Sequence, residues 1–465
     1  MAELTGDMTG RTAAVQQRSG EPGGNGAGTS GFLLDVPFNA RVPWAQHFFL
    51  SVQNMLVMAG LFLFPGLFGV TFHLKPTEIA TLYGAAFVVV GFGTVLQGVL
   101  FLNMPMVLGP WSGSLAGLLV TGKLYGLGTA FGSLVIAAAI ITVLSIPITG
   151  ASITQRVASV FNAPILSGGI VFITGIGLTQ IGVVNWIGTP GHVGFGAGNW
   201  IGGGIALVVV AILFAFTKGV FRALAMIVGI VIGSFVFRAF APVSFSAVSS
   251  GPWLAVPSFF HFGFGVNFTA VVLFLILLLP PIISALGFYP VIGEWGGETI
   301  SSRRMAWGVF GVSLTGVAAG LLGTFSGAVY PENVGLLRSS KVGSRWVTVT
   351  AGVLFIVVGF VYKVGAVFVS IPSGVIGAAA VAMFAIIMVS GIEILSRVEW
   401  VPRNIIVLGL PTVLSVGGVF LSPTVYANYP LLARELITEP LVTGPILLVI
   451  FFIIDRLLPA TNKAK

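Results

Sequence analysis

The sequence predicts an all-helical protein that crosses a membrane many times. Only 7% of its 465 residues are Asp, Glu, Lys or Arg, against about 25% in an ordinary soluble protein. Hydrophobic residues make up 56% of the chain and the mean hydropathy is +1.06. From Trp44 onward, apolar runs of about 17–25 residues follow one another, each long enough to cross the hydrocarbon layer. So few charges cannot cover a soluble protein of this size, and we therefore predict an integral membrane protein.

The composition also excludes several other classes of protein. The chain has no Cys, which excludes a disulfide scaffold. The formal net charge is +8, but the basic residues are scattered singly between apolar runs, so no nucleic-acid surface is predicted. We find no metal-ligand spacing, no Ser-His-Asp pattern and no phosphate-binding loop. The sequence thus predicts neither an enzyme nor a bound metal or cofactor.

Fourteen membrane segments are predicted, in two sets of seven. Residues 1–43 are expected to form a largely disordered tail that becomes interfacial from residue 32, and residues 459–465 a short C-terminal tail. The first set of segments covers 44–66, 77–100, 104–120, 128–150, 161–182, 200–217 and 222–242. The second set covers 268–293, 305–323, 331–341, 346–368, 373–392, 404–421 and 442–458.

The distribution of basic residues predicts the orientation. With the N-terminus inside the cell, 16 of the 21 basic residues fall on the inner side. The outer side keeps Lys75, Lys123, Arg238, Lys363 and Arg434. This excess follows the positive-inside rule, so both termini are expected to be cytoplasmic. Seven spans per half give the halves opposite orientations, which makes an inverted repeat a hypothesis that rests on hydropathy alone.

The third member of each set is interrupted by residues that break helices. LGPWSGSLAG (108–117) and GTFSGAVYPENVG (323–335) place Gly, Pro and Ser at membrane depth, and Pro331 is suited to the first turn of a short helix. A single such break is often a packing kink. Two breaks at corresponding places in the two halves instead indicate a transport site.

Three of the 13 acidic residues fall where acids are costly, namely Glu294, Glu298 and Glu332. Glu294 and Glu298 share one helical face, and Gly296 and Gly297 leave room beside them. Buried carboxyl groups can take up and release protons near neutral pH, which suits proton coupling. The alternative is that both are solvated at the membrane interface. Glu332 lies at a predicted helix start, where it either binds a ligand or only caps the helix.

One histidine lies early in the first span. His47 is either a structural hydrogen-bond donor or a proton carrier, and the sequence leaves both interpretations open.

Three motifs resemble the nucleobase–ascorbate transporter family, the second class of nucleobase–cation symporters. The family signature is matched by Glu332-Asn333-Val334-Gly335 followed by Ser340-Lys341, with Ser in place of the usual Thr. Gln46-His47 is similar to the family's Gln-His pair. Residues 294–299 (EWGGET) are similar to its eighth-span pattern. The resemblance extends from about residue 44 to 458.

This resemblance implies a fold and an assembly. Core-domain segments would occupy 44–150 and 243–368, and gate-domain segments 151–242 and 369–458. Short antiparallel strands around 109–113 and 327–331 would cross near the middle of the membrane. A homodimer formed through the gate domain is also implied.

The implied substrate is a nucleobase, imported together with protons; sodium is a less favoured coupling ion. The carboxylates of Glu294 and Glu332 would accept the N–H groups of the base. Backbone N–H groups near Ser112, Gly113 and Tyr330 would donate to its carbonyls, and Tyr330 or Trp111 would pack against its ring. Pro331 replaces a more usual small residue at this site.

The motifs do not agree on which base is carried. Glu332 favours uracil, whereas the acid at 298 is more typical of purine carriers, and uracil is preferred overall. The alternatives are an anion carrier of the same architecture and a membrane enzyme; the acids at the site argue against the first, and the missing catalytic residues against the second.

Overall fold

The computed structural model describes residues 33–56, 58–148, 150–161, 163–191, 193–218, 220–429, 433 and 437–457. The side chains of Pro331 and Glu332 are outside this description, although their backbone belongs to a helix. The predicted tails at 1–32 and 459–465 also lie outside the described residues.

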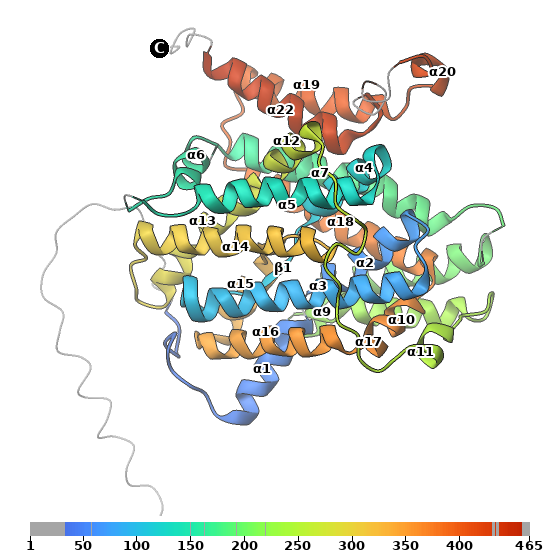
Figure 1. The fold of residues 1–465 in the computed structure, drawn as a ribbon, viewed down its shortest axis with the longest axis horizontal. Coiled ribbons are helices and arrows are strands. Elements are labelled where there is room, and N and C mark those ends of the chain that lie inside the picture. Colours follow the sequence, from blue (N-terminus) through green and yellow to red (C-terminus); the bar gives the residue numbers. More distant parts are fainter. Residues whose placement is uncertain are drawn as a thin grey trace, which may run out of the picture. The chain divides into compact units, whose positions relative to one another are not determined.

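The described part of the chain is helical apart from two three-residue strands (Figure 1). Its first half contains α1 (Trp44–Leu56), α2 (Ala59–Thr71), α3 (Pro76–Leu96), the π-helix η1 (Gln97–Phe101), β1 (Leu108–Pro110), α4 (Ser112–Tyr125), α5 (Leu127–Leu144), α6 (Ile153–Phe161), α7 (Pro164–Ile187), the π-helix η2 (Gly198–Gly203), α8 (Gly204–Phe216), α9 (Val220–Ala223), α10 (Ala225–Phe237) and α11 (Ser246–Ser250). Its second half contains α12 (Phe268–Leu277), α13 (Leu279–Trp295), α14 (Ser302–Leu322), β2 (Gly327–Val329), α15 (Pro331–Ser340), α16 (Arg345–Phe360), α17 (Tyr362–Val369), α18 (Ser373–Leu395), α19 (Pro402–Gly418), α20 (Pro423–Tyr426) and α22 (Pro440–Leu457).

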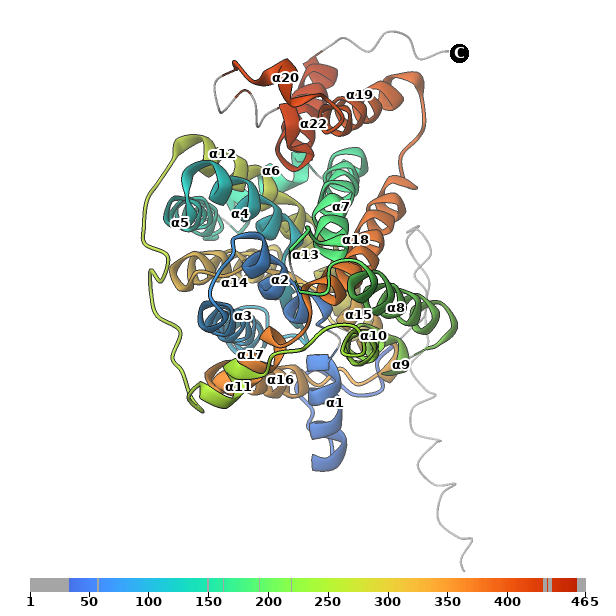
Figure 2. The same ribbon diagram turned by 90° about the vertical axis from the view of Figure 1, so that its right-hand side faces the viewer.

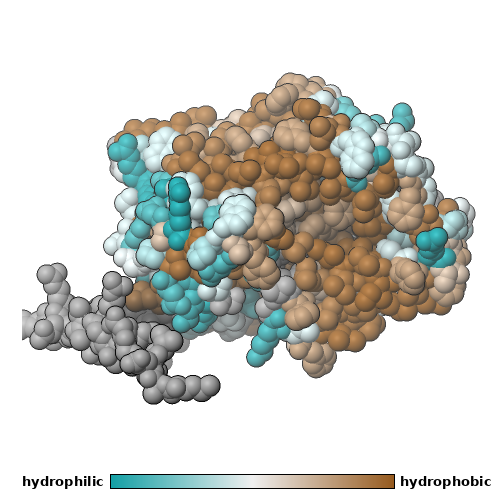
Figure 3. All heavy atoms as spheres, turned by 90° about the horizontal axis from the view of Figure 1, so that it is seen from below, coloured by the Kyte–Doolittle hydropathy of each residue, from teal (hydrophilic) through white to brown (hydrophobic). Residues whose placement is uncertain are grey.

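The helices confirm a protein that crosses the membrane many times. Within the described residues, nine helical stretches are long and apolar enough to span a membrane, and α10 and α16 are shorter apolar helices. Much of the surface drawn in Figure 3 is hydrophobic, with hydrophilic residues gathered toward its ends. A helix overlaps each of the fourteen predicted segments.

Several predicted segment boundaries were wrong. The first segment extends to Thr71 as two consecutive helices, α1 and α2, instead of ending at residue 66. The fourth segment was expected to reach residue 150, but α5 ends at Leu144. Hydropathy alone does not mark these ends, because apolar residues continue past them.

Two neighbouring layers of helices make up the bundle. In one layer α12, α5, α14, α3, α16 and α1 pack side by side in that order. Figure 1 shows α5, α14, α3 and α16 as parallel rows. The other layer is built around the long contact between α7 and α18, and Figure 2 shows both layers nearly end-on. Apolar burial gives little drive for helix association in lipid, so close packing of small residues must contribute. A Cβ on Gly91 of α3 would lie 2.5 Å from the carbonyl oxygen of Gly352 in α16, so only glycine permits this approach.

The two strands β1 and β2 pair antiparallel, as the family resemblance implies. Leu108 pairs with Val329, Gly109 with Ala328 and Pro110 with Gly327. The first strand begins one residue before the predicted 109 and ends at Pro110 instead of 113, whereas the second begins at the predicted Gly327 and ends at Val329 instead of 331. Residues 112–113 and 331 already belong to helices, because the N–H groups of Ser114 and Asn333 bond to the carbonyls of Trp111 and Tyr330.

Candidate functional site

Each strand is held by a buried threonine and leads directly into a helix. Thr94 of α3 accepts a hydrogen bond from the N–H of Leu108 at 3.0 Å, and Thr315 of α14 accepts one from the N–H of Gly327 at 2.9 Å. Helix α4 begins after β1 and helix α15 begins after β2. The crossing therefore brings the N-terminal ends of two short helices to the same part of the protein.

The start of α4 offers unused backbone donors. Ser114 and Leu115 donate their N–H groups to the carbonyl of Trp111. The N–H groups of Ser112 and Gly113 have no hydrogen-bond partner within the described residues, and the Ser112 side chain is only 4% exposed. Free N–H groups at a helix start favour a carbonyl oxygen or an anion. The substrate-binding role of Ser112 and Gly113 stays a prediction.

The N–H of Tyr330 does not match its predicted role as a donor. It points to the carbonyl of Val107 at 3.4 Å, beyond the last strand pair, and so is already directed at a backbone acceptor. The Tyr330 side chain is buried beside β1 and α2. A Cβ on Gly60 would lie 2.5 Å from its hydroxyl oxygen, 2.9 Å from Pro110 and 3.4 Å from Met383 of α18. Tyr330 thus lies where α2, β1 and α18 meet.

Trp111 is fixed against a different helix from Tyr330. Its indole N–H donates to the carbonyl of Leu277 at the end of α12, at 2.8 Å, and its ring covers Gly113. Trp111 contacts α12 and α4, whereas Tyr330 contacts α2 and approaches α18. The two rings are therefore held by different helices.

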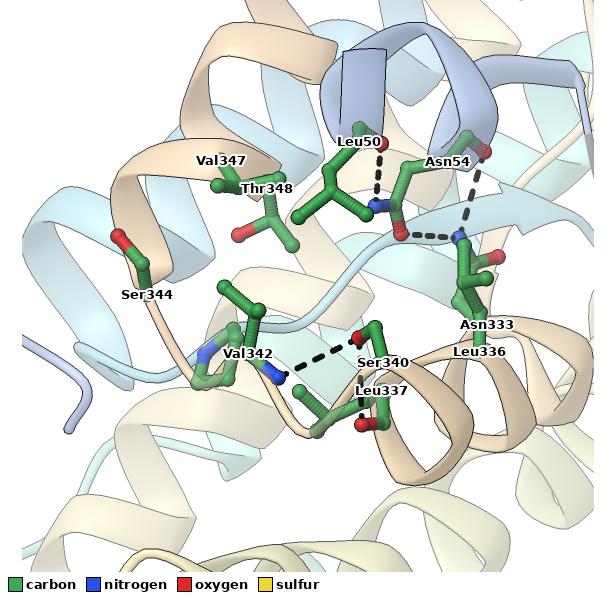
Figure 4. Close-up of a pocket in the computed structure, with 11 residues that line it drawn as sticks. Leu50, Asn54, Asn333, Leu336, Leu337, Ser340, Val342, Ser344, Val347 and Thr348 are labelled. Carbon is green, nitrogen blue, oxygen red and sulfur yellow. Dashed lines mark hydrogen bonds between the residues drawn. The ribbon is translucent and has the colours of Figure 1, made fainter. Parts of the chain in front are cut away.

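The signature segment of α15 is joined to α1 through a pair of asparagines (Figure 4). The side-chain amide of Asn333 donates to the side-chain oxygen of Asn54 at 2.8 Å and approaches the Asn54 carbonyl at 3.3 Å. Asn54 in turn donates to the carbonyl of Leu50 at 2.8 Å. Asn333 is 5% exposed and Asn54 is 8% exposed. The side-chain oxygen of Asn333, Oδ1, is buried and has no hydrogen-bond partner in the described part of the chain.

A small polar pocket lies beside this pair. It is lined by residues of α1, α15 and α16 together with the connections next to them, namely Leu50, Asn54, Pro105, Asn333, Leu336, Leu337, Ser340, Val342, Ser344, Val347 and Thr348. Its free space suits about one water molecule. A nucleobase is larger, so this pocket does not admit one as the structure stands.

The remaining signature residues take local roles at the end of α15. The Ser340 hydroxyl lies 3.4 Å from the Leu337 carbonyl and accepts from the N–H of Val342. Lys341 adopts a left-handed conformation (φ 56°) and ends the helix. Gly335 is exposed, and a Cβ there would meet nothing within 4 Å.

Glu294 does not lie at the strand crossing, contrary to prediction. Helix α13 packs against β2 through its first turns, around Pro281 and Ile282. Glu294 is exposed in the last turn, 12 residues beyond Ile282, or about 18 Å along the helix axis. The adjacent Trp295 lies under Arg338, at the far end of α15 from Glu332.

Two glycines explain why α13 stops there. Gly296 and Gly297 follow Glu294 and Trp295, and Gly297 has a left-handed φ of 72°. A glycine in this conformation commonly follows a helix end. The sequence predicts that these two glycines leave room beside the acids. In the structure they end the helix instead.

Glu298 lies in the connection after α13 and is bound by an arginine. Its carboxylate accepts from Arg304 at 2.7 Å, and its side chain is 39% exposed. Arg304 also donates to the carbonyls of Leu102 at 2.6 Å and Asn103 at 3.1 Å. Glu298 therefore matches the alternative of a solvated acid near basic residues, and not that of a buried acid.

The predicted motif pair of the first span lies on the surface of the bundle. Gln46 is exposed, and Nε2 of the half-buried His47 is 2.8 Å from the hydroxyl of Thr350 in α16. The residues seven positions later, Gln53 and Asn54, are both 8% exposed. Sequence reasoning missed this second pair, although polar residues in the middle of an apolar span are themselves a signal.

Among the described residues, no group of three or more His, Cys, Asp or Glu side chains could hold a metal ion. The site consists of free backbone donors, amides, hydroxyl groups and aromatic rings. Such groups can bind a polar, uncharged, planar molecule, and none of them is arranged for covalent catalysis.

The fold places the chain in a class of multi-pass membrane proteins. It is similar to the transmembrane domain of the cyanobacterial bicarbonate transporter BicA, with a TM-score of 0.55 at 15% identity over 89% of this chain and 100% of that one. It is also similar to the murine anion transporter Slc26a9, with a TM-score of 0.59 at 9% identity over 90% of this chain and 69% of that one.

The sequence identifies the family within this class. Residues 45–424 match the family model of the xanthine/uracil permeases, described as a permease family. Similar curated proteins are the uric acid permease PucJ of Bacillus subtilis (27% identity; 85% of this chain, 90% of that protein) and the xanthine permease of the same organism (26%; 90% and 95%). The uric acid transporter UacT of Escherichia coli is 26% identical over 82% of this chain and 79% of its own length. The chain belongs to the xanthine/uracil permease family, whose members are transporters and not enzymes.

Proposed function

We propose that this protein imports a nucleobase by proton symport. The observation that carries the proposal is the strand crossing, from which α4 begins with two buried N–H groups, at Ser112 and Gly113, that have no partner among the described residues. A neutral base with carbonyl groups is a suitable acceptor for these donors. Family membership supports the same class of cargo.

The favoured substrate is an oxidised purine such as xanthine or uric acid. The names of the relatives support this choice, since PucJ and UacT are uric acid carriers and the Bacillus protein is a xanthine permease. Uracil, which the sequence favours through Glu332, is the second candidate. A panel of bases distinguishes the two.

Alternating access between a core and a gate domain is proposed as the mechanism. The supporting observation is a correspondence between the two halves of the chain. Helix α3 packs on α16 as α14 packs on α5. In the same way, α8 packs on α10 as α19 packs on α22. Thr94 and Thr315 bind their strands in the same way. These pairings support an inverted repeat, with α7 and α18 as related gate helices.

Proton coupling is proposed to involve Glu294, with Glu298 and His47 as further candidates. Glu294 is exposed in the last turn of α13. We expect Glu294→Gln to abolish accumulation driven by a proton gradient while retaining some exchange. Unchanged accumulation would remove Glu294 from the mechanism.

Glu332→Gln should alter base selectivity, and an unaltered competition profile would count against its role.

The orientation and the assembly are proposals as well. The excess of basic residues on one side supports cytoplasmic termini. Because the chain has no Cys, single cysteines can be introduced on each side and labelled with an impermeant reagent. Crosslinking of single cysteines in α19 or α22 tests the homodimer through the gate domain.

An anion carrier is the second candidate function, because the fold is similar to a bicarbonate and an anion transporter. Purified protein should be screened by thermal shift against xanthine, uric acid, hypoxanthine, uracil, bicarbonate and sulfate. Stabilisation by one or more bases supports the proposal. Stabilisation by anions alone would replace it with the anion carrier.

A further inference from the structure

A short segment before the first helix is built into the bundle. Residues Leu34–Phe38, here called the strap, form a parallel bridge at Val36 and Val342. The N–H of Asp35 donates to the Lys341 carbonyl at 2.9 Å, and the N–H of Gly343 donates back to the Val36 carbonyl at 3.0 Å. Chain-terminal segments are poorly ordered unless they are tied down. These bonds fix the strap to the connection between α15 and α16.

The strap joins three helices at one end of the bundle. The N–H of Leu34 donates to the Trp295 carbonyl, the last residue of α13, at 2.8 Å. The N–H of Arg345, the first residue of α16, donates to the Phe38 carbonyl at 2.8 Å. The sequence predicts this end to be cytoplasmic.

Phe38 anchors the strap between two glycines. Its side chain is 2% exposed although its neighbours in sequence are exposed or half-buried. The ring covers Gly296 so closely that a Cβ there would collide with it, and a Cβ on Gly343 would lie 3.4 Å from it. Gly296 directly follows the end of α13, and Gly343 lies between α15 and α16. The Phe38 ring thus fills the space between these two helix ends.

The position of α15 depends on both of its ends. This helix has 10 residues and is therefore about 15 Å long. Its first turn continues from the strand crossing and includes Asn333, which binds Asn54. Its last turn is followed by Lys341, whose carbonyl accepts from the strap. A change at the strap would tilt a short helix whose other end contributes to the proposed base site.

We propose that the strap is a positioning element for the substrate site and that Phe38 is its key residue. It holds the ends of α13 and α15 together, so that the start of α15 stays aligned with the strand crossing. This inference rests on the proposed nucleobase site. Phe38 does not touch that site and acts only through α15.

The test uses the full-length protein in nanodiscs with radiolabelled xanthine and uric acid as probes. Phe38→Ala should raise the Kd about 2- to 30-fold, the range typical of residues that act on a site through a connected network. Hydrogen exchange at the N–H groups of Gly343 and Arg345 should become faster, because their acceptors belong to the strap. Phe38→Leu fills most of the space and should restore both readouts. Phe48→Ala, which removes a 45% exposed ring from α1, is the matched control and should change neither.

A second variant tests the same contact from the other side. Gly296→Ala should displace the Phe38 ring and also raise the Kd, and adding Phe38→Leu to it should recover part of the affinity.

Different failures have different meanings. If wild-type protein binds and Phe38→Ala speeds exchange at Gly343 without changing the Kd, the strap is only a tether and the inference is wrong. If exchange is unchanged, Phe38 does not anchor the strap and the inference is wrong again. If the wild-type protein binds no base at all, the proposed function fails and the positioning role fails with it.

Discussion

The hydrogen bond between Asn54 and Asn333 should couple α1 energetically to the signature helix. The perturbation is a double-mutant cycle of Asn54→Ala, Asn333→Ala and the double variant. Asn333→Ala leaves Asn54 Oδ1 without its 2.8 Å partner, whereas Asn54→Ala leaves the Asn333 amide only the longer 3.3 Å contact to the backbone. Hydrogen bonds between membrane helices average about 0.6 kcal/mol and reach about 1.7 kcal/mol. Because both residues are buried, we expect a coupling of about 1–1.7 kcal/mol.

The assay is the free energy of unfolding of the purified protein, measured by titration with sodium dodecyl sulfate in mixed micelles. Asn185 in α7 is the matched control, because within the described residues its amide bonds only to the Ile181 carbonyl of its own helix, at 2.8 Å. Asn185→Ala combined with Asn333→Ala should be additive within about 0.5 kcal/mol. An Asn54–Asn333 coupling no larger than that of the control pair would refute the account of this contact.

Three further predictions concern packing and the connection before β1. Gly132→Ala should lower the melting temperature, because the new Cβ would collide with the Gly265 carbonyl. The control Gly409→Ala should leave the melting temperature unchanged, because a Cβ there meets nothing within 4 Å. Equal melting temperatures for the two variants would contradict this prediction. Gly60→Ala should weaken base binding, because the new Cβ would displace the Tyr330 hydroxyl. The control Gly287→Ala, in open space on α13, should leave the affinity unchanged. Unchanged affinity in both variants would count against a site at Tyr330. Arg304→Ala should cost about 1.5–3 kcal/mol in unfolding titrations because the Leu102 and Asn103 carbonyls lose a charged donor. Glu298→Gln should cost less than about 1 kcal/mol, since that ion pair is partly exposed, and the reverse order would refute the assignment.

The sequence was sufficient for the features that depend on composition and on helix-breaking residues. The apolar runs predicted the helices, and the Gly, Pro and Ser residues at 108–117 and 323–335 predicted the paired interruptions. The strand register could not be predicted, because Leu108↔Val329 depends on contacts between segments more than 200 residues apart.

The side chains of the site were harder to place than the helices. Glu294 was expected within the membrane, but Gly296 and Gly297 end α13 directly after it, and this helix-ending signal was present in the sequence. The pair Gln46-His47 matched a family motif, yet Gln53 and Asn54, two turns later, are the buried pair. Neither hydropathy nor a two-residue motif fixes the depth of a span or its rotation. Phe38 could not be recognised, because its burial depends on glycines 296 and 343.

We propose above all that the protein moves a nucleobase across a membrane together with protons. The most direct test is uptake of radiolabelled xanthine, uric acid, hypoxanthine and uracil into proteoliposomes with an imposed inward proton gradient. We predict accumulation of at least one base above its equilibrium level, abolished by a protonophore and competed by the unlabelled base. No uptake of any of these bases, or uptake of bicarbonate alone, would contradict the account.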